Sequence, residues 1–337
     1  MTTQVLLTID TELAWRHHAR GASWQENLRF SYDGAGAGVP YQLEVLKRHG
    51  LKACFFVDPM PALVYGIEPV EQMVAPILAA GQEVQLHLHS FWRDLAQGRS
   101  DDARFELTGF GYREQLDLIE TARDLLVAAG APQPTAFRAG SYAADAHTLA
   151  ALAALGIRHD SSHNGAEPMS RLPFGRELVD PAEHDGVMEI PISQIRRPDG
   201  GLRPLQICAL SIAEMRAALW HAGSQRHSIA TIVCHSFELA TRDGRRVNRL
   251  VRSRFDALCA FLASHAAILP TADFRTLALD PDRPAAEPLA TGRLRTAHRM
   301  AEQAWGQARY ENPLAGATIV AVPPLVAFEE LVALAGL

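Results

Sequence analysis

Short apolar runs alternate with longer amphipathic stretches along most of the chain. The apolar runs have the length of buried strands, and they cover residues 5–9, 53–57, 84–89, 135–138, 188–192, 229–235 and 267–270. The stretches between them place apolar residues at helical spacing, over residues 40–49, 67–80, 112–129, 144–155, 211–222 and 246–265. In the third of these, one helix face collects Leu116, Ile119, Leu125 and Leu126.

This alternation predicts an α/β fold. Strands that alternate with helices are typical of a parallel sheet with helical crossovers, in either a barrel or a doubly wound sheet. The first strand is not followed by G-x-G-x-x-G, and the chain has no Walker loop. The pattern therefore argues against the nucleotide-binding version of this fold class.

The end of the chain is expected to form a separate part. Residues 280–290 contain the Pro- and Ala-rich run DPDRPAAEP, which is typical of a linker. They would separate a main domain of residues 1–279 from a C-terminal α/β extension of residues 291–337. In the extension we expect a helix over 291–309, a strand over 318–322 and a short final helix. It packs on the main domain or forms a homo-oligomer interface, and the sequence leaves both open.

Two of the predicted strands end in pairs of side chains that can bind a metal ion. The segment QLHLHSFW carries His87 and His89, and the segment LLTIDTEL carries Asp10 and Glu12. Residues two apart on a strand share a face, and functional groups gather at the carboxyl ends of parallel strands. Each pair alone has an ordinary alternative, polar surface for the histidines and helix capping for the acids. Together they favour a metal site of zinc, with manganese, cobalt or iron as alternatives.

Three further segments place polar groups after apolar ones. Arg138 lies in FRAGSY, Asp160 in IRHDSSH, and His235 at the end of TIVCHSFEL. Each also has an ordinary interpretation, as an ion-pair partner, a turn residue or a strand-end histidine. Cys234 and His235 do not form a thiol dyad, because neighbouring strand residues face opposite ways.

The order of these motifs resembles that of the polysaccharide deacetylases, the NodB-homology group of carbohydrate esterases. The resemblance covers residues 3–275 and adds the segments KACFFV and EIPIS to those above. It implies a distorted (β/α) barrel of about seven strands. It also implies hydrolysis of an N-acetyl group on an amino sugar or glycoconjugate, with one bound divalent metal.

The resemblance assigns acid–base roles to four residues. Asp10 matches the general base that acts on metal-bound water, and Arg138 matches the arginine that orients this base. His235 matches the acid that protonates the leaving amine, and Asp160 matches the carboxylate that supports it.

The metal ligands depart from the usual family pattern. Thr11 fills the position of the usual carboxylate ligand, so Glu12, on the same strand face as Asp10, is the expected substitute. The family's two histidines are commonly four residues apart, but Phe91 lies four beyond His87. The expected ligands are therefore Glu12, His87 and His89, with both histidines bound from an extended segment.

The resemblance also indicates where the substrate lies. A backbone N–H at Ser141 or Tyr142 matches the group that binds the oxyanion. Candidates for the lining of the substrate pocket are Trp15, Arg16, His17, His18 and Trp92, with loop packing as the equal alternative.

Composition restricts the partners. The net charge of −6 argues against nucleic acid or an anionic membrane as the main partner. The arginines between Arg242 and Arg252 recur at helical spacing and are interpreted as a solvated helix face. No apolar run reaches the roughly 18 residues of a membrane span. Scattered cysteines and the lack of a signal-like start predict a cytoplasmic protein, which would meet a small, nucleotide-linked or lipid-linked acetylated sugar.

Two other functions compete with this interpretation. The first is an amidohydrolase-type metal hydrolase acting on a non-sugar amide, although in that group the H-x-H usually ends the first strand. The second is a catalytically weak glycan-binding homologue, because Thr11 and Phe91 occupy positions where ligands are usual.

Overall fold

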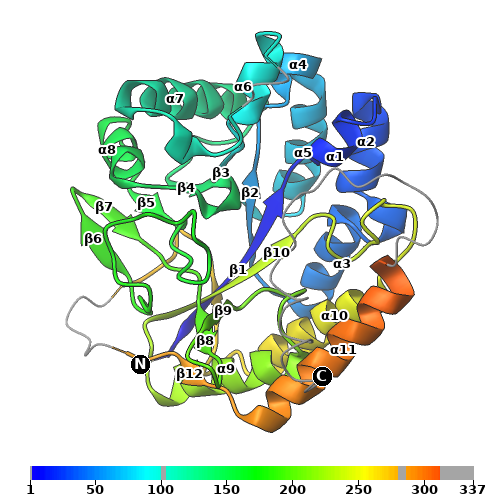
Figure 1. The fold of residues 1–337 in the computed structure, drawn as a ribbon, viewed down its shortest axis with the longest axis vertical. Helices are drawn as coiled ribbons and strands as arrows, with labels where there is room; N and C mark the ends of the chain where they lie inside the picture. Colours follow the sequence, from blue (N-terminus) through cyan, green and yellow to red (C-terminus); the bar gives the residue numbers. More distant parts are fainter. Residues whose placement is uncertain (1, 100–103, 280–285, 312–337) are drawn as a thin grey trace, which may run out of the picture.

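A curled half-barrel of parallel strands forms the centre of the molecule (Figure 1). The structure, a computed structural model, describes residues 2–99, 104–279 and 286–311. In spatial order the strands are β10 (Ile229–His235), β1 (Gln4–Thr11), β2 (Cys54–Val57), β3 (Glu83–Leu88), β4 (Ala136–Ala139), β5 (His159–Asp160), β7 (Val187–Glu189) and β6 (Ala182–His184). Only β6 among these runs antiparallel to its neighbour, and a further short strand, β11 (Thr271–Ala272), pairs with β1.

The strands bring distant segments of the sequence to one edge of the sheet. Parallel pairing aligns Asp10 on β1 with His235 on β10, and His87 on β3 with Arg138 on β4. The strand interiors are completely buried, as in a sheet with both faces covered. The carboxyl ends of β1, β3, β4 and β10 therefore meet at one end of the half-barrel.

Amphipathic helices connect the strands and surround the sheet (Figure 1). They are α3 (Val39–His49), α5 (Glu68–Ala79), α7 (Tyr112–Ala128), α8 (Ala146–Ala154), α9 (Ile212–Ser224) and α10 (Arg249–Ser264). Each agrees with a predicted helix to within a few residues. In α7 the buried face includes Leu118, Ile119 and Leu126, whereas Leu116 and Leu125 are only partly buried.

Short helices follow the strand ends. These are α1 (Trp15–His18) and α2 (Trp24–Ser31) after β1, α4 (Ala62–Tyr65) after β2, and α6 (Phe91–Ala96) after β3. Short 3₁₀ turns, η1 (Gly34–Gly36), η2 (Leu107–Gly109) and η3 (Gly140–Tyr142), complete this end. The chain here forms the loops that surround the candidate site.

A small second sheet lies beside the half-barrel. It consists of β8 (Gln194–Arg196), β9 (Leu202–Pro204) and β12 (Leu289–Ala290). The segment that leads into it bonds back to the barrel, since the Ser193 N–H donates to the Thr231 carbonyl of β10 at 3.1 Å. Residues of the expected linker thus pair with β8.

The described part of the C-terminal extension packs on the barrel. Helix α11 (Arg293–Gly306), followed by the π-helix η4 (Gln307–Glu311), lies against α9 and α10 (Figure 1). Arg254 of α10 pairs with Glu302 at 2.8 Å, and Arg299 Nε lies 3.4 Å from Glu214 Oε2 of α9. The expected strand over 318–322 lies outside the described residues, and the domain division stays a prediction.

The predicted α/β barrel class is confirmed, with two local corrections. The last barrel strand is Thr271–Ala272 rather than residues 267–270, because residues 265–269 still belong to the turn that ends α10. Arg242, Arg245 and Arg246 lie in a turn before α10 and not on a helix face. None of the described helices has both the length and the apolar character needed to cross a bilayer.

Candidate active site

Asp10 and Arg138 form a buried ion pair at the carboxyl end of the half-barrel. Arg138 Nη1 lies 2.5 Å from Asp10 Oδ1 and also donates to Thr8 Oγ1 at 2.9 Å. Its other nitrogens donate to Ser161, and its guanidinium stacks on the Phe56 ring at 4.3 Å. Because almost every donor of Arg138 has a protein acceptor, the arginine holds Asp10 in one orientation.

Glu12, His87 and His89 converge on one point beside this pair. Potential ligand atoms of the three residues all lie within 4.8 Å of one another. Glu12 Oε2 lies 3.3 Å from His87 Nε2 and contacts His89 Nε2. Burial acts to raise the pKa of Glu12, but His89 and His87 hold it well below its ordinary value. Burial acts to lower the pKa of His89, but Glu12 raises it to about 9. Two imidazole nitrogens with one carboxylate oxygen are a donor set that suits zinc.

The backbone around the trio fixes both imidazoles. His87 Nδ1 bonds to the Arg138 carbonyl at 2.8 Å, which leaves Nε2 of His87 free to bind a metal. A Cβ atom at Gly140 would come within 2.5 Å of His89 Cε1, so this position has room only for glycine. The extended arrangement expected for the two histidines is therefore present, with β3 ending at Leu88.

His235 faces two carboxylates. Its Nε2 lies 3.8 Å from Asp10 Oδ2, and its Nδ1 lies 2.9 Å from Glu238 Oε1. Burial alone would lower the pKa of His235, but Glu238, followed by Asp10, raises it to about 9. Gln206 and Cys208 also donate to Glu238 Oε1, at 2.5 and 3.2 Å, so this carboxylate is firmly placed.

Asp160, the expected partner of His235, makes other contacts. It accepts from Ser162 Oγ at 2.6 Å and shares a hydrogen bond with Glu189. Glu238 takes the expected role because the turn after β10 folds back within three residues and brings it to Nδ1. Burial raises the pKa of Asp160 to about 6 and that of Glu189 well above its ordinary value, and repulsion from Asp160 adds to the shift of Glu189.

A pocket of about 180 Å³ opens beside the Glu12 and His89 side chains. Its remaining lining residues are Leu13, Ala14, Trp15, Arg16, Phe91 and Arg242. The prediction that Trp92 lines such a pocket is wrong, because Trp92 is fully buried and packs on His18 and Tyr65. Its neighbour Phe91 reaches the pocket instead, with its ring 5.5 Å from His89 and 5.3 Å from Trp15.

The turn after β4 has a strained backbone. Ser141 and Tyr142 have φ values of 52° and 56°, in the left-handed region that non-glycine residues rarely adopt. Tyr142 is buried, and burial together with Asp10 raises its pKa well above the ordinary value. Strain of this kind concentrates at functional sites, where the surrounding structure maintains it.

Three further acids of the site were not found from the sequence. Glu238 binds His235, Asp58 is buried directly after β2, and Glu106 hydrogen-bonds Ser141 near His89. Burial raises the pKa of Asp58 to about 6, although His89 and His87 act to lower it. The strand-end rule that selected Asp10 also selects Asp58 in FFVDP, whereas the contact of Glu106 depends on a loop.

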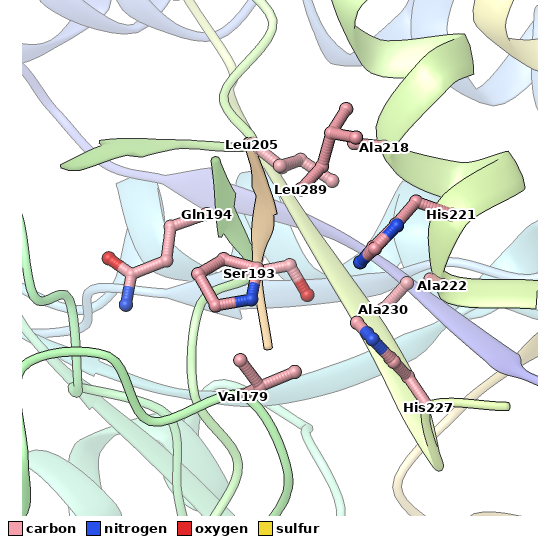
Figure 2. Close-up of a pocket in the computed structure, with 11 residues that line it drawn as sticks. Val179, Ser193, Gln194, Leu205, Ala218, His221, Ala222, His227, Ala230 and Leu289 are labelled. Atoms are coloured by element: carbon pink, nitrogen blue, oxygen red, sulfur yellow. The ribbon is translucent and has the colours of Figure 1, made fainter. Parts of the chain in front are cut away.

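A second pocket lies at the other end of β10 (Figure 2). Residues that line it include Ser193, His221 and His227, together with Ala230 near the start of β10. Its volume of about 20 Å³ is close to the minimum for a single water molecule. A sugar cannot enter it, so the pocket at Glu12 and His89 is the better candidate.

Comparison with known families agrees with this geometry. Residues 31–159 match the family model described as polysaccharide deacetylase. Over these residues the chain is similar to the polysaccharide deacetylase family. The matched region contains His87, His89 and Arg138, whereas Asp10, Glu12 and His235 lie outside it. A search of curated proteins found no match.

Several solved structures are similar to this chain. A Mycobacterium smegmatis protein assigned to the polysaccharide deacetylases is 19% identical, covers 85% of this chain and 95% of its own, and gives a TM-score of 0.48. A family 4 carbohydrate esterase pseudoenzyme from Bacillus anthracis is 12% identical, with coverage of 82% and 65% and a TM-score of 0.41. A 4-alpha-glucanotransferase from Thermococcus litoralis is 12% identical, with coverage of 81% and 40% and a TM-score of 0.50. The last likeness shows a shared fold.

Proposed function

We propose that this protein is a metal-dependent hydrolase of the polysaccharide deacetylase family that removes an N-acetyl or similar acyl group from an amino sugar. The observation that carries the proposal is the position of Asp10. One of its oxygens lies 2.5 Å from Arg138 and the other lies 3.8 Å from His235, next to the Glu12, His87 and His89 trio. A base, an acid and a cation site thus surround one point.

The trio would hold one divalent cation, with zinc as the expected metal and manganese, cobalt or iron as alternatives. The fit rests on the converging Nε2 atoms of both histidines and on the bond that occupies His87 Nδ1. A bound divalent cation would polarise the acyl carbonyl and lower the pKa of a coordinated water to about 7. Phe91 does not remove a ligand here, because His89 reaches Glu12.

Asp10 is the proposed general base. Arg138 occupies Oδ1 of Asp10 and leaves Oδ2 to accept a proton from the attacking water. The fixed guanidinium balances the charge of Asp10 inside the protein, where an unpaired carboxylate would be costly. We therefore assign Arg138 to positioning.

His235 is the proposed general acid. The departing amine is a poor leaving group until it is protonated, and Nε2 of His235 would supply that proton. Glu238 binds Nδ1 and raises the pKa of the imidazole to about 9, so His235 carries its proton at neutral pH. Glu238 replaces Asp160 in the supporting role.

The substrate would lie in the pocket beside Glu12 and His89. Trp15 and Phe91 offer aromatic faces there for an acetylated sugar ring. A backbone N–H of the strained turn at Ser141 and Tyr142 stays the proposed oxyanion donor. Four free cysteines are compatible with the cytoplasmic location that we also propose.

Acetate release from a panel of N-acetylated sugars, conjugates and polymers tests the proposal. Zinc-loaded protein should release acetate from at least one member. Asp10→Asn and His235→Ala should each keep the metal and lose about 100-fold or more in rate, the usual range for a general acid or base. A glycan that binds without acetate release would instead favour a catalytically weak homologue, and hydrolysis of non-sugar amides alone would favour the amidohydrolase alternative.

A further inference from the structure

Arg16 borders the pocket and has no carboxylate partner among the residues that the structure describes. Its Nε donates to the Arg242 carbonyl at 2.7 Å, and its guanidinium stacks on the Phe237 ring at 4.7 Å. These contacts place the guanidinium but leave its other N–H groups without an acceptor in the described part of the chain. The side chain is half-buried and lines the pocket.

Other buried arginines of the protein are paired. Arg138 faces Asp10, Arg254 faces Glu302, and Arg299 faces Glu214. Among residues 2–99, 104–279 and 286–311, no salt bridge within 4 Å involves Arg16 or its pocket neighbour Arg242. Arg16 is less buried than these three and, like the half-buried Arg252, has no salt bridge among the described residues.

The charge around Arg16 is mainly positive. Burial, then repulsion from Arg242 and Arg20, lowers the pKa of Arg16 to about 10, and Glu12 and Glu311 offset only part of this. Arg245 and Arg246 follow Arg242 in the same exposed turn. This local excess of positive charge contrasts with the net charge of −6 of the whole chain.

We propose that Arg16 and Arg242 bind an oxyanion on the substrate, so that the preferred substrate is an amino sugar carrying a phosphate or carboxylate group. The inference rests on the proposed function, because both arginines line the same pocket as Glu12 and His89. A guanidinium matches either group with two parallel hydrogen bonds, and the partial burial of Arg16 strengthens them. The acyl group would lie at the trio and the anionic group at the arginine end.

Calorimetric titration of the zinc-loaded protein tests this preference directly. The ligands are N-acetylglucosamine, its 1-phosphate and N-acetylmuramic acid, which share an acetylated ring and differ in charge. At least one anionic sugar should bind about tenfold or more tightly than the neutral one, the size expected for one charged hydrogen-bond pair. Which of the two gains affinity distinguishes phosphate from carboxylate, and added salt should weaken that gain.

Three variants locate the effect. Arg16→Gln and Arg242→Gln should each reduce the anionic-to-neutral affinity ratio several-fold. Arg252→Gln is the matched control, because Arg252 is also half-buried and stacks on an aromatic ring, Tyr41 at 4.5 Å, outside the pocket. Equal affinity of the wild type for neutral and anionic sugars, or an equal loss of the ratio in Arg252→Gln, would overturn the proposal.

Acetate release is measured separately on the same ligands. Preferential binding of the anionic sugar without acetate release would support the arginine site and contradict the deacetylase function. Equal affinities for all three sugars together with equal rates of acetate release would support the deacetylase function and contradict the arginine site.

Discussion

At the scale of single residues, the proposed acid–base chemistry depends on the two carboxylates that face His235. Glu238 binds Nδ1, which directs the transferable proton to Nε2 on the side of Asp10. Glu238 is also the largest cause that raises the pKa of the imidazole, against the lowering effect of burial. The protonation of His235 at neutral pH therefore depends first on Glu238, and Asp10 adds to the effect.

Replacing Glu238 by Gln should move the alkaline limb of the kcat/KM profile. A general acid must be protonated, so wild-type activity should fall as the pH rises through about 9, the raised pKa of His235. Without the carboxylate, the pKa of His235 should fall, although Asp10 and Glu12 still raise it, and the alkaline limb should move to lower pH. Glu177→Gln, which removes an exposed carboxylate paired with Arg196, is the control. An unshifted limb in Glu238→Gln would contradict the assignment.

Gly140 provides the space that the His89 ring occupies. Gly140→Ala would place Cβ inside contact distance of the imidazole, so His89 should be displaced and the metal content of purified protein should fall. Gly175→Ala is a matched control, since a Cβ atom there meets nothing within 4 Å. Full metal occupancy in Gly140→Ala would show that His89 is not a required ligand.

The buried pair of Asp160 and Glu189 should make the free energy of unfolding depend on pH. Both carboxyl groups have raised pKa values in the folded protein, so their contribution to stability is present at low pH and is lost as the pH rises above their ordinary values of 3.8 and 4.5. In Glu189→Gln, the amide can donate to Asp160 without titrating. The variant should gain stability relative to wild type between pH 5 and 9, by about 1.4 kcal/mol for each pKa unit removed. Chemical denaturation at pH 5 and pH 9 measures the free energy of unfolding of both proteins. A difference between them that is the same at both pH values would contradict a proton shared by Asp160 and Glu189.

At the scale of elements, regular strands could be predicted and short loops could not. Side chains along a strand point alternately to its two faces, so the segment QLHLH was sufficient to place His87 and His89 on one face. Asp10 and Arg138 followed from strand ends in the same way. Glu238 could not be found, because its contact with His235 depends on a turn, which contains too few residues for a periodic signal. Trp92 and Phe91 show the same limit, since both are buried at the start of α6 and only Phe91 lines the pocket.

Helix α11 is attached to the barrel through buried charge. Arg299 is 2% exposed, lies 3.4 Å from the fully buried Glu214 of α9, and donates to Gln303. Arg299→Met should leave Glu214 with an uncompensated charge and lower the free energy of unfolding by about 3 kcal/mol. Thermal unfolding would detect this as a reduced Tm. Arg295→Met, on an exposed face of the same helix, should have little effect, and equal stability of the two variants would contradict a buried pair.

At the scale of the whole molecule, the residues of the candidate site lie together at one edge of the half-barrel. The parallel register sets β1 beside β10, and β3 beside β4, so residues more than two hundred positions apart meet at Asp10 and His235. The family match reaches only residues 31–159, and the fold supplies the remainder of the site. The proposed reaction requires a single cation held by Glu12, His87 and His89 next to the proposed acid and base.

Zinc titration into metal-stripped protein tests that claim most directly, with bound zinc and acetate release followed together. The rate should rise in proportion to bound zinc and stop rising at one zinc per chain. His89→Ala should retain no zinc under the same conditions and show no rise. Acetate release that is independent of zinc, or full zinc occupancy in His89→Ala, would contradict the account.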